Sequence, residues 1–357
     1  MRIAQVAPLW ERVPPVTYGG TELVVGLLTD ELVRRGHEVT LFASGDSITL
    51  ARLEPIHPCA MRQDPSLKEY AVCEALELAQ VYKRASEFDI IHSHVGYSSL
   101  PLAQLVKTPT VHTLHGIFTP DNVKIFTYFQ QQPYVSISKS QRQALPELNY
   151  VATVYNGINV ASYQFYPQPQ QPPYLAFLGR FSPEKGPHHA IEIAKRTGLP
   201  LRMAGKVDVV DKDYFETAIK PHIDGKQIEF LGEVNHSQKN KLLGGAVATL
   251  FPITWREPFG LVMTESMAAG TPVIAMALGS APEIIVPGKT GFLCQSVDEC
   301  VMALDRLSEI DRRACRQHVE QNFSVKSMVD GYEAVYRQIV ANSLDNDGCM
   351  PTSAIAA

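Results

Sequence analysis

The sequence predicts an α/β protein of two domains, each with a parallel sheet between layers of helices. Its 357 residues are too many for one ordinary core and suit two domains of about 100–200 residues. Short β-branched runs alternate with amphipathic helical stretches over most of the chain, the pattern of parallel sheets covered on both faces. A proline-rich break divides this alternation into two halves.

The first domain is expected over residues 1–165. Its strands are predicted at 2–7, 38–43, 89–92, 110–114, 134–137 and 152–155. The clearest helix spans residues 21–35 and is followed by Gly36, a residue type that commonly ends helices. Gly19 and Gly20 precede this helix, so a turn without side chains leads to free helix-start amides, which favour an anion.

A second domain of the same kind is expected over residues 166–323. Residues 164–173 hold four prolines and four glutamines without periodicity, which indicates an interdomain linker. The strands that follow are predicted at 175–178, 201–204, 229–231, 248–251 and 272–275, with helices beginning near residues 187, 211, 237, 259 and 281. Further helices are expected at 297–321 and 324–341, and residues 342–357 are expected to form a frayed tail.

Charge and cysteine content exclude several classes of protein. There are 37 acidic and 32 basic residues, a net charge of -5, and both halves share the deficit, so neither half is suited to nucleic acid. The six cysteines show no paired spacing, which indicates neither a disulfide framework nor a zinc site and favours a cytoplasmic location. No stretch approaches the roughly 18 apolar residues of a membrane span, so any membrane contact is expected to be peripheral.

The most specific motif is the segment 255–265, in which Glu257 and Glu265 flank a helix start. Pro258 and Phe259 are expected to open this helix. The amides that the helix start would leave free to hold a phosphate belong to Gly260, Leu261 and Val262. Glu265, about two turns into the helix, could accept hydrogen bonds from a ribose. The segment alone equally fits a glutamate cap at one end and a solvent-exposed glutamate at the other.

Two further motifs follow predicted strands. Arg180 and Lys185 lie on the loop after the strand at 175–178, where they could neutralise a diphosphate. Two exposed cations on a polar turn are the simpler interpretation of that loop taken alone. His115 follows the strand at 110–114, and a lone histidine is ordinarily structural. His112, on the other face of the strand, is interpreted as a core residue or as one that supports the pocket from behind.

Together these segments resemble the nucleotide-sugar signature of the retaining family 4 glycosyltransferases (glycosyl transferases group 1) of the GT-B fold. The resemblance extends to about Ala341. It implies two Rossmann-like domains facing each other across a cleft, an acceptor-binding one over 1–165 and a donor-binding one over 166–323. The helix at 324–341 would return to the N-terminal domain.

The resemblance also implies roles for individual residues. Glu265 would hold the nucleotide ribose, Glu257 would reach the donor sugar, Arg180 and Lys185 would stabilise the departing nucleotide, and His115 would contact the transferred sugar. The full donor-binding set is Gly19, Gly20, Gly179, Arg180, Lys185, Gly205, Glu257, Phe259, Gly260, Leu261, Val262 and Glu265. The residues expected on the acceptor side are Trp10, Tyr18, Ser138 and Asn156.

The expected function is a retaining, metal-independent transfer of a hexosyl group from a nucleotide sugar. UDP-glucose is the first candidate donor and GDP-mannose the second, and the acceptor is a sugar, a lipid or a small metabolite. Two alternatives stay open, a non-catalytic nucleotide-sugar-binding regulatory subunit and a nucleotide-sugar epimerase. No G-x-G-x-x-G follows the first strand and no P-loop motif exists, which disfavours dinucleotide and ATP-hydrolysing enzymes. Asp211 and Asp213 are interpreted as charges at a helix start, so no metal or other cofactor is expected.

Overall fold

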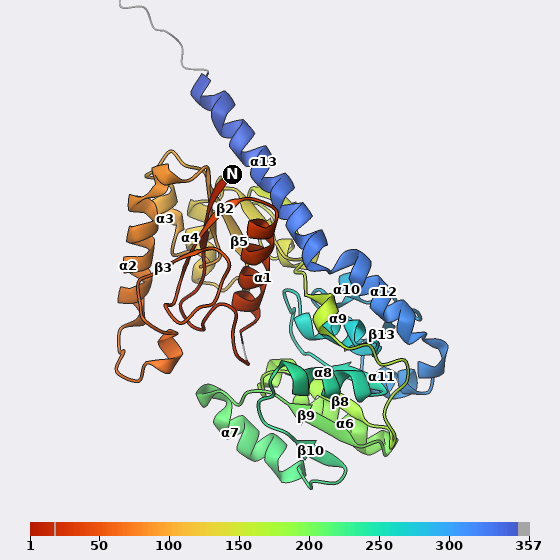
Figure 1. Cartoon of the computed structure of the whole chain (residues 1–357). Coiled ribbons are helices and arrows are strands. Elements are labelled where there is room, and N and C mark those ends of the chain that lie inside the picture. Colours follow the sequence, from red (N-terminus) through yellow and green to blue (C-terminus); the bar gives the residue numbers. More distant parts are fainter. Residues whose placement is uncertain (18, 349–357) are drawn as a thin grey trace, which may run out of the picture.

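The structure is a computed structural model that describes residues 1–17 and 19–348. It forms two lobes, each built on one sheet (Figure 1). The first sheet, in the order β3-β2-β1-β4-β5-β6-β7, contains β1 (Arg2–Val6), β2 (Glu38–Ala43), β3 (Arg52–Pro55), β4 (Ile90–Ser93), β5 (Thr110–Leu114), β6 (Tyr134–Ser136) and β7 (Tyr150–Thr153). The second, in the order β10-β9-β8-β11-β12-β13, contains β8 (Leu175–Leu178), β9 (Leu201–Ala204), β10 (Ile228–Phe230), β11 (Ala248–Phe251), β12 (Val273–Met276) and β13 (Gly291–Cys294).

Neighbouring strands run parallel throughout both sheets, which confirms the predicted fold class. Strands covered by helices on both faces are apolar along their whole length rather than alternating. All residues of β5 and β11 are buried in this way. The carboxyl ends of parallel strands share one edge of a sheet, and loops at that edge are where open α/β proteins bind ligands.

Helices surround each sheet (Figure 1). In the first half they are α1 (Gly20–Arg34), α2 (Tyr70–Lys83), α3 (Leu100–Ala103), α4 (Asn122–Tyr128) and α5 (Lys139–Arg142). In the second half they are α6 (Pro187–Thr197), α7 (Lys212–Tyr214), α8 (His236–Gly245), α9 (Leu261–Ala268), α10 (Ala281–Ile284), α11 (Val297–Leu304), α12 (Arg312–Asn322) and α13 (Val325–Gly348). The predicted helix at 21–35 corresponds to α1, and Gly36 has the left-handed φ of 86° that suits a residue just past a helix.

Several predicted boundaries are wrong. The short edge strands β3 and β13 were not predicted, and β3 carries charged residues and ends in Pro55, a composition typical of a sheet edge. The stretch 297–321 forms two helices, because Asp311 caps a new one by accepting a hydrogen bond from the amide of Arg313 at 2.9 Å. The strand expected at 152–155 is β7, two residues earlier.

The long helix α13 joins the C-terminal end of the chain to the N-terminal lobe, as expected. Its residues Met328, Val329, Tyr332 and Tyr336 are buried in one core with Ile3 of β1. The helical backbone continues to Gly348, so residues 342–348 are helical rather than frayed. The rest of the predicted tail, residues 349–357, lies outside the described part of the chain.

The chain passes between the lobes at two places that pair with each other. The amide of Ile158 donates to the carbonyl of Phe323 at 2.9 Å, and the amide of Val325 donates to the carbonyl of Ile158 at 3.1 Å. Residues 164–173 form no helix or strand, as a linker should, but they are attached to the second lobe. One attachment is the amide of Gln170, which donates to the carbonyl of Gly245 at 2.8 Å.

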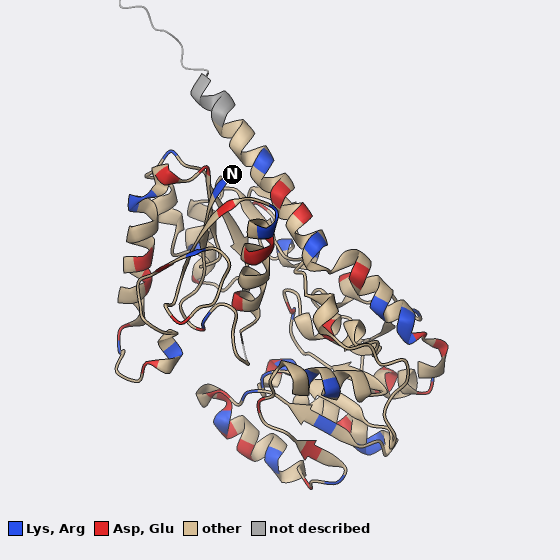
Figure 2. Cartoon of the chain, viewed as in Figure 1, with Lys and Arg blue, Asp and Glu red and all other residues tan. Residues whose placement is uncertain are grey.

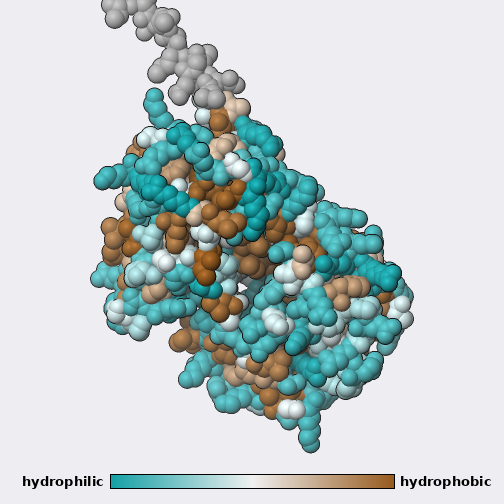
Figure 3. All heavy atoms as spheres, viewed as in Figure 1, coloured by the Kyte–Doolittle hydropathy of each residue, from teal (hydrophilic) through white to brown (hydrophobic). Residues whose placement is uncertain are grey.

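Positive and negative residues are interspersed over both lobes in the view of Figure 2, which agrees with the absence of a basic half in the sequence. Within residues 1–17 and 19–348, no helix combines the length and the apolar composition that crossing a bilayer requires. Figure 3 shows hydrophilic residues over much of this face and a hollow between the two lobes.

Candidate active site

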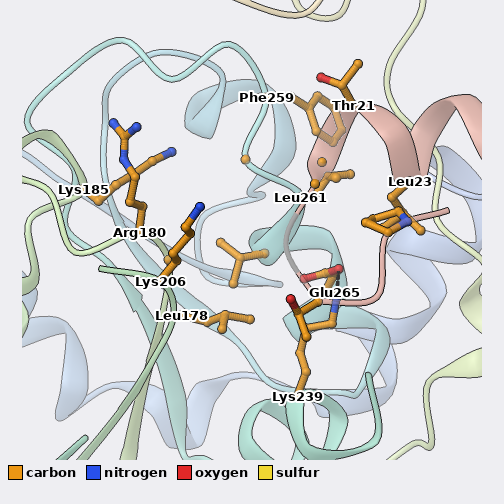
Figure 4. Close-up of a pocket in the computed structure, with 18 of the residues that line it drawn as sticks. Thr21, Leu23, Leu178, Arg180, Lys185, Lys206, Lys239, Phe259, Leu261 and Glu265 are labelled. Carbon is orange, nitrogen blue, oxygen red and sulfur yellow. Dashed lines mark hydrogen bonds and ion pairs between the residues drawn. The ribbon is translucent and has the colours of Figure 1, made fainter. Parts of the chain in front are cut away.

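A cavity of about 470 Å³ lies between the two lobes, where the carboxyl ends of both sheets meet. Both domains contribute to its wall: the loop before α1 and the end of β5 on one side, and the loops after β8, β9 and β11 on the other. In Figure 4, Arg180, Lys185 and Lys206 stand at one side of this cavity, and Glu265 and Lys239 lie at another.

The structure brings most of the predicted site residues into this one cavity. Those that line it are Gly19, Gly20, His115, Asn156, Gly179, Arg180, Lys185, Gly205, Glu257, Phe259, Gly260, Leu261, Val262 and Glu265. Trp10 lines a neighbouring cavity instead. Ser138 is buried and caps α5 by accepting a hydrogen bond from the amide of Gln141 at 3.1 Å, which is a structural role. Tyr18 lies outside the described residues.

The loop after β8 carries two cations, and both are paired with carboxylates. Arg180 forms an ion pair with Glu184, and its Nε lies 3.5 Å from a carboxylate oxygen of Asp211. Lys185 forms an ion pair with Glu257. A ligand anion that approaches these cations must therefore replace carboxylates that already neutralise them.

Gly186 allows this loop to approach the strand β11. Its φ of 71° is left-handed, and a Cβ added there would lie 1.9 Å from the carbonyl oxygen of Pro252. A side chain at this position would therefore push the loop, and Lys185 with it, away from the end of β11. This close contact explains why glycine follows the lysine.

Glu257 is held on the wall that the C-terminal domain contributes. Its carboxylate accepts a hydrogen bond from the indole Nε1 of Trp255 at 2.9 Å in addition to the ion pair with Lys185. Its backbone packs against Gly279, where an added Cβ would lie 2.4 Å from both the nitrogen and the oxygen of Glu257. The position of this carboxylate is thus fixed by its partners and by its main chain.

The helix α9 begins at Leu261, not at Pro258 or Phe259 as predicted, because Gly260 adopts a left-handed φ of 81° and forms the N-cap. The amide of Met263 donates to the carbonyl of Gly260 at 3.1 Å. The amides of Leu261 and Val262 come too early in the helix to reach a carbonyl of a preceding turn. They therefore remain suited to a phosphate, as does the positive end of the helix dipole.

Glu265 is only 4% exposed, and two donors hold one of its oxygens. The hydroxyl of Tyr163 donates to Oε1 at 2.8 Å, and Nζ of Lys239 donates to the same atom. A carboxylate oxygen can still accept at Oε2, so the pair of donors orients the second oxygen for another partner. A vicinal diol, such as that of a ribose, offers hydrogen-bond donors of this kind.

His115 belongs to a buried chain of hydrogen bonds. Its Nε2 lies 2.9 Å from Nδ1 of His94, whose Nε2 lies 2.9 Å from Oε1 of Gln5. The Gln5 amide donates to Tyr336, so its oxygen accepts from Nε2 of His94, and Nδ1 of a neutral His94 then accepts from His115. Burial lowers the pKa of His115 to about 4, so the ring is neutral at pH 7 and keeps Nδ1 as an acceptor.

Sequence reasoning missed several residues of this cavity, among them Lys206, Lys239, Glu233 and His236. Lys206 directly follows Gly205 at the end of β9, so the rule that ligands bind at this sheet edge could have identified it. Lys239 lies one turn into α8, and no local pattern connects it with Glu265. Tyr163, which contacts the same glutamate, precedes the linker, where nothing in the sequence indicates such a role.

The described residues include no group of three or more histidine, cysteine, aspartate or glutamate side chains placed to hold a metal ion. Asp211 instead faces Arg180 and forms the N-cap of α7, consistent with its interpretation as a charge at a helix start.

The arrangement as a whole can bind a diphosphate through cations and helix amides, and a ribose through a buried carboxylate.

Comparison with known proteins identifies the family of this chain. Residues 162–322 match the family model described as glycosyl transferases group 1, and residues 18–162 match the model of glycosyltransferase family 4. Glycogen synthase of Mycobacterium tuberculosis is 26% identical over 400 residues, covering 94% of this chain and 94% of that protein. N-acetyl-alpha-D-glucosaminyl L-malate synthase of Bacillus anthracis is 25% identical over 373 residues, covering 90% of this chain and 94% of that protein.

Solved structures show the same fold. AviGT4, a glycosyltransferase involved in avilamycin A biosynthesis, has a TM-score of 0.72 at 25% identity, covering 96% of this chain and 98% of that one. Sucrose-phosphate synthase from Thermosynechococcus elongatus has a TM-score of 0.79 at 20% identity, covering 96% and 100%. Anabaena HepE in complex with UDP and glucose has a TM-score of 0.74 at 18% identity, covering 95% and 100%.

Proposed function

Because this chain belongs to the family 4 glycosyltransferases of the GT-B fold, we propose that it transfers a hexosyl group from a nucleotide sugar to an acceptor, with retention of anomeric configuration and without a metal ion. UDP-glucose is the first candidate donor, and GDP-mannose is the second. Structures of Anabaena HepE that hold UDP or UDP-glucose support the uridine donor. A relative named phosphatidyl-myo-inositol mannosyltransferase, from Mycobacterium leprae, supports considering a mannosyl donor.

The observation that carries this proposal is the placement of two opposite chemistries in one cavity. Arg180, Lys185 and the first amides of α9 are suited to a diphosphate, and Glu265 is suited to the ribose attached to it. A nucleoside diphosphate is a ligand that offers both groups at once. The cavity of about 470 Å³ falls in the range typical of such ligand sites.

Transfer of a glycosyl group develops positive charge on the sugar and negative charge on the leaving diphosphate. Positioned charges and dipoles stabilise such charges most effectively where water is excluded. We expect the diphosphate to take Lys185 from its ion pair with Glu257, so that the freed carboxylate can accept hydrogen bonds from the sugar hydroxyls. Neutral His115 would contact the same sugar through Nδ1, and the leaving phosphate would help to deprotonate the acceptor on the same face.

Metal independence is supported by the number of cations that line the cavity. Arg180, Lys185 and Lys206 can each contribute to balancing the charge of a diphosphate, which in other glycosyltransferases is the task of a metal. Turnover that persists in excess EDTA, with no gain on adding Mg²⁺ or Mn²⁺, is the expected result. The anomeric configuration of the product, read by NMR from its anomeric coupling constant, tests retention.

A panel of UDP- and GDP-sugars, assayed for transfer with a metabolite extract as acceptor source, tests the donor. We expect Glu265→Ala and Lys185→Ala to lower donor kcat/KM roughly 10- to 100-fold, because each removes a charged hydrogen-bonding group worth about 1.5–3 kcal/mol. Lys226→Ala, an exposed lysine of the same domain, is the matched control and should keep wild-type turnover.

The outcomes separate the alternatives. Undiminished transfer in both site variants would remove the site assignment. Tight UDP binding with no transfer or hydrolysis of any donor would indicate a nucleotide-sugar-binding regulatory subunit. Release of an altered nucleotide sugar in the absence of acceptor would indicate an epimerase.

A further inference from the structure

A second cavity, of about 190 Å³, lies beside the first in the N-terminal lobe. Leu9 and Trp10 reach it from the loop after β1, Val95 from the end of β4, and Glu74 and Glu77 from α2. It therefore lies at the carboxyl edge of the N-terminal sheet, where open α/β sheets bind ligands.

Glu77 is the unusual member of this cavity. Its side chain is 2% exposed, and Oε1 has no hydrogen-bond partner among the described residues. Burial and the neighbouring Glu74 raise its pKa well above the ordinary range. Buried polar groups nearly always find a partner, and a buried carboxyl group that lines a cavity without one is suited to a ligand that supplies the hydrogen bond.

Apart from Glu74 and Glu77, the wall is apolar or aromatic. The ring of Trp10 packs 4.9 Å from that of Tyr70, which fixes its orientation, and Leu9 and Val95 add aliphatic surface. A flat aromatic ring beside carboxyl oxygens matches a sugar, because the C–H face of a pyranose packs on the ring while its hydroxyls bond to the carboxyl group.

None of the described residues that line this cavity is a lysine or an arginine. Arg62 is not among the lining residues; its guanidinium carbon lies 5.8 Å from the centre of the Trp10 ring, and it is paired with Glu11 at 3.1 Å. A phosphate or carboxylate inside the cavity would therefore be buried beside glutamates without a cation to pair with, which is costly.

The two cavities are connected through one pair of side chains. His94 lines the second cavity, and its Nδ1 lies 2.9 Å from Nε2 of His115, which lines the first. A molecule in the second cavity would thus contact His94, which is joined by one hydrogen bond to the histidine that faces the proposed donor sugar.

We propose that the second cavity is an acceptor subsite for an uncharged, hydroxyl-bearing ring such as a sugar, with Glu77 as the hydrogen-bonding group and Trp10 as the packing surface. This inference rests on the proposed function. It excludes acceptors that must bury a phosphate or a carboxylate in this cavity, and it excludes a lipid chain there, because an alkyl chain offers no hydrogen bond to Glu77.

The first experiment identifies the charge class of the acceptor. A metabolite extract is divided by ion exchange and solvent extraction into neutral, anionic and lipid fractions, and each is incubated with the enzyme and the labelled donor selected by the donor panel. We expect labelled product from the neutral fraction. Product formed only from the anionic or the lipid fraction would overturn the subsite, while the proposed transferase function would stand. If no fraction gives product, the transferase function itself fails.

The second experiment tests the named residues with the neutral acceptor so found. Glu77→Leu and Trp10→Ala should raise the acceptor KM at least 10-fold, and they should leave the donor KM and the hydrolysis of donor without acceptor within about 2-fold. Glu69→Leu, at an exposed glutamate beside the same helix, is the matched control and should leave both KM values unchanged. Equal changes in donor and acceptor KM, or none in either, would contradict the assignment.

Discussion

The hydroxyl of Tyr163, the residue that precedes the interdomain linker, donates a hydrogen bond to Oε1 of Glu265 on α9 at 2.8 Å. Lys239 of α8 donates to the same oxygen. Three segments that are distant in sequence thus converge on one buried carboxylate. The consequence is that Oε2 is the oxygen left to contact a ligand in the cavity.

Replacing Tyr163 by phenylalanine should therefore weaken recognition of the ribose without removing the carboxylate. We expect Tyr163→Phe to lower donor kcat/KM roughly 2- to 10-fold, the effect of one net hydrogen bond of about 0.5–1.5 kcal/mol. The loss should be smaller with a 2′-deoxyribose donor, since that donor lacks one of the hydroxyls that Glu265 would bind. Tyr128→Phe, at a tyrosine 79% exposed in the other domain, provides the control. An equal loss with both donors would show that Tyr163 acts on folding rather than on ribose binding.

The close contact between Gly279 and the backbone of Glu257 leads to a second prediction. A Cβ at Gly279 would lie 2.4 Å from main-chain atoms of Glu257, so Gly279→Ala must displace this glutamate and its partner Lys185. We expect kcat/KM to fall about 10- to 100-fold, because small misplacements of reacting groups have effects of that size. Steady-state kinetics with the identified donor measure the change.

Gly288 supplies a control matched in backbone conformation. Its φ of 72° resembles the 58° of Gly279, but an added Cβ would meet nothing within 4 Å. Both alanine variants should lose about 1–2 kcal/mol of stability from the left-handed conformation, and only Gly279→Ala should also lose catalysis. If the two variants have the same activity, the contact does not position Glu257.

Acid sensitivity is expected from the buried histidines of the N-terminal domain. Burial lowers the pKa of His112 to about 4, from 6.5 in an exposed histidine, although its hydrogen bond with Gln132 opposes the shift. Between these two values the unfolded chain binds the proton and the folded chain does not, so stability falls as the pH falls through this window. At pH 5 the loss from this residue is about 2 kcal/mol relative to neutral pH.

The variant His112→Gln isolates the contribution of His112 to the pH dependence of stability. Burial raises the pKa of Glu22 to about 7, which favours the folded state at low pH, but this contribution is common to both proteins and cancels in their difference. We expect the difference in unfolding free energy between wild type and variant, from urea titrations at pH 7.5 and pH 5, to change by about 2 kcal/mol against the wild type at the lower pH. A difference independent of pH would mean that His112 already accepts the proton in the folded state.

The sequence predicted those parts of the fold whose pattern is local. The helix α1 has a long apolar stripe with glycines at both ends, and β5 is a short run rich in β-branched residues, so both were placed within a residue or two. The edge strand β3 has no such run, since its stability comes from pairing with β2 rather than from its own composition. The break between α11 and α12 depends on the cap at Asp311, which the apolar period does not reveal.

The candidate site divides in the same way. Residues at strand ends and at the start of α9 could be predicted, because the topology of parallel sheets collects them at one edge. The roles of three other residues could not be predicted. Lys239 and Tyr163 matter through their contacts with Glu265, which is far away in sequence, and Glu77 matters because its buried oxygen has no hydrogen-bond partner among the described residues. A sequence pattern records spacing along the chain, whereas these contacts between distant residues exist only in the folded protein.

The linker itself provides the last prediction, through a buried arginine. The guanidinium of Arg312 on α12 donates to the carbonyls of Tyr166, Ala246 and Gly244, with 2.8 Å and 2.9 Å to the first two. Desolvation in this buried position lowers its pKa to about 10, which leaves it charged at neutral pH. One side chain thus joins the linker to the end of α8.

Arg312→Met keeps the length of the side chain but leaves these buried carbonyls without donors. Unpaired groups of this kind cost about 1–3 kcal/mol each, so we expect the C-terminal domain to lose roughly 3–5 kcal/mol of stability. The neighbouring Arg313→Met is a matched control on the exposed side of α12 and should change stability by less than about 0.5 kcal/mol. Urea unfolding followed by far-UV circular dichroism measures both. If the two variants unfold at the same urea concentration, the guanidinium does not fasten the linker, and the attachment must rest on the other contacts of residues 164–173, among them the hydrogen bond from the amide of Gln170 to the carbonyl of Gly245.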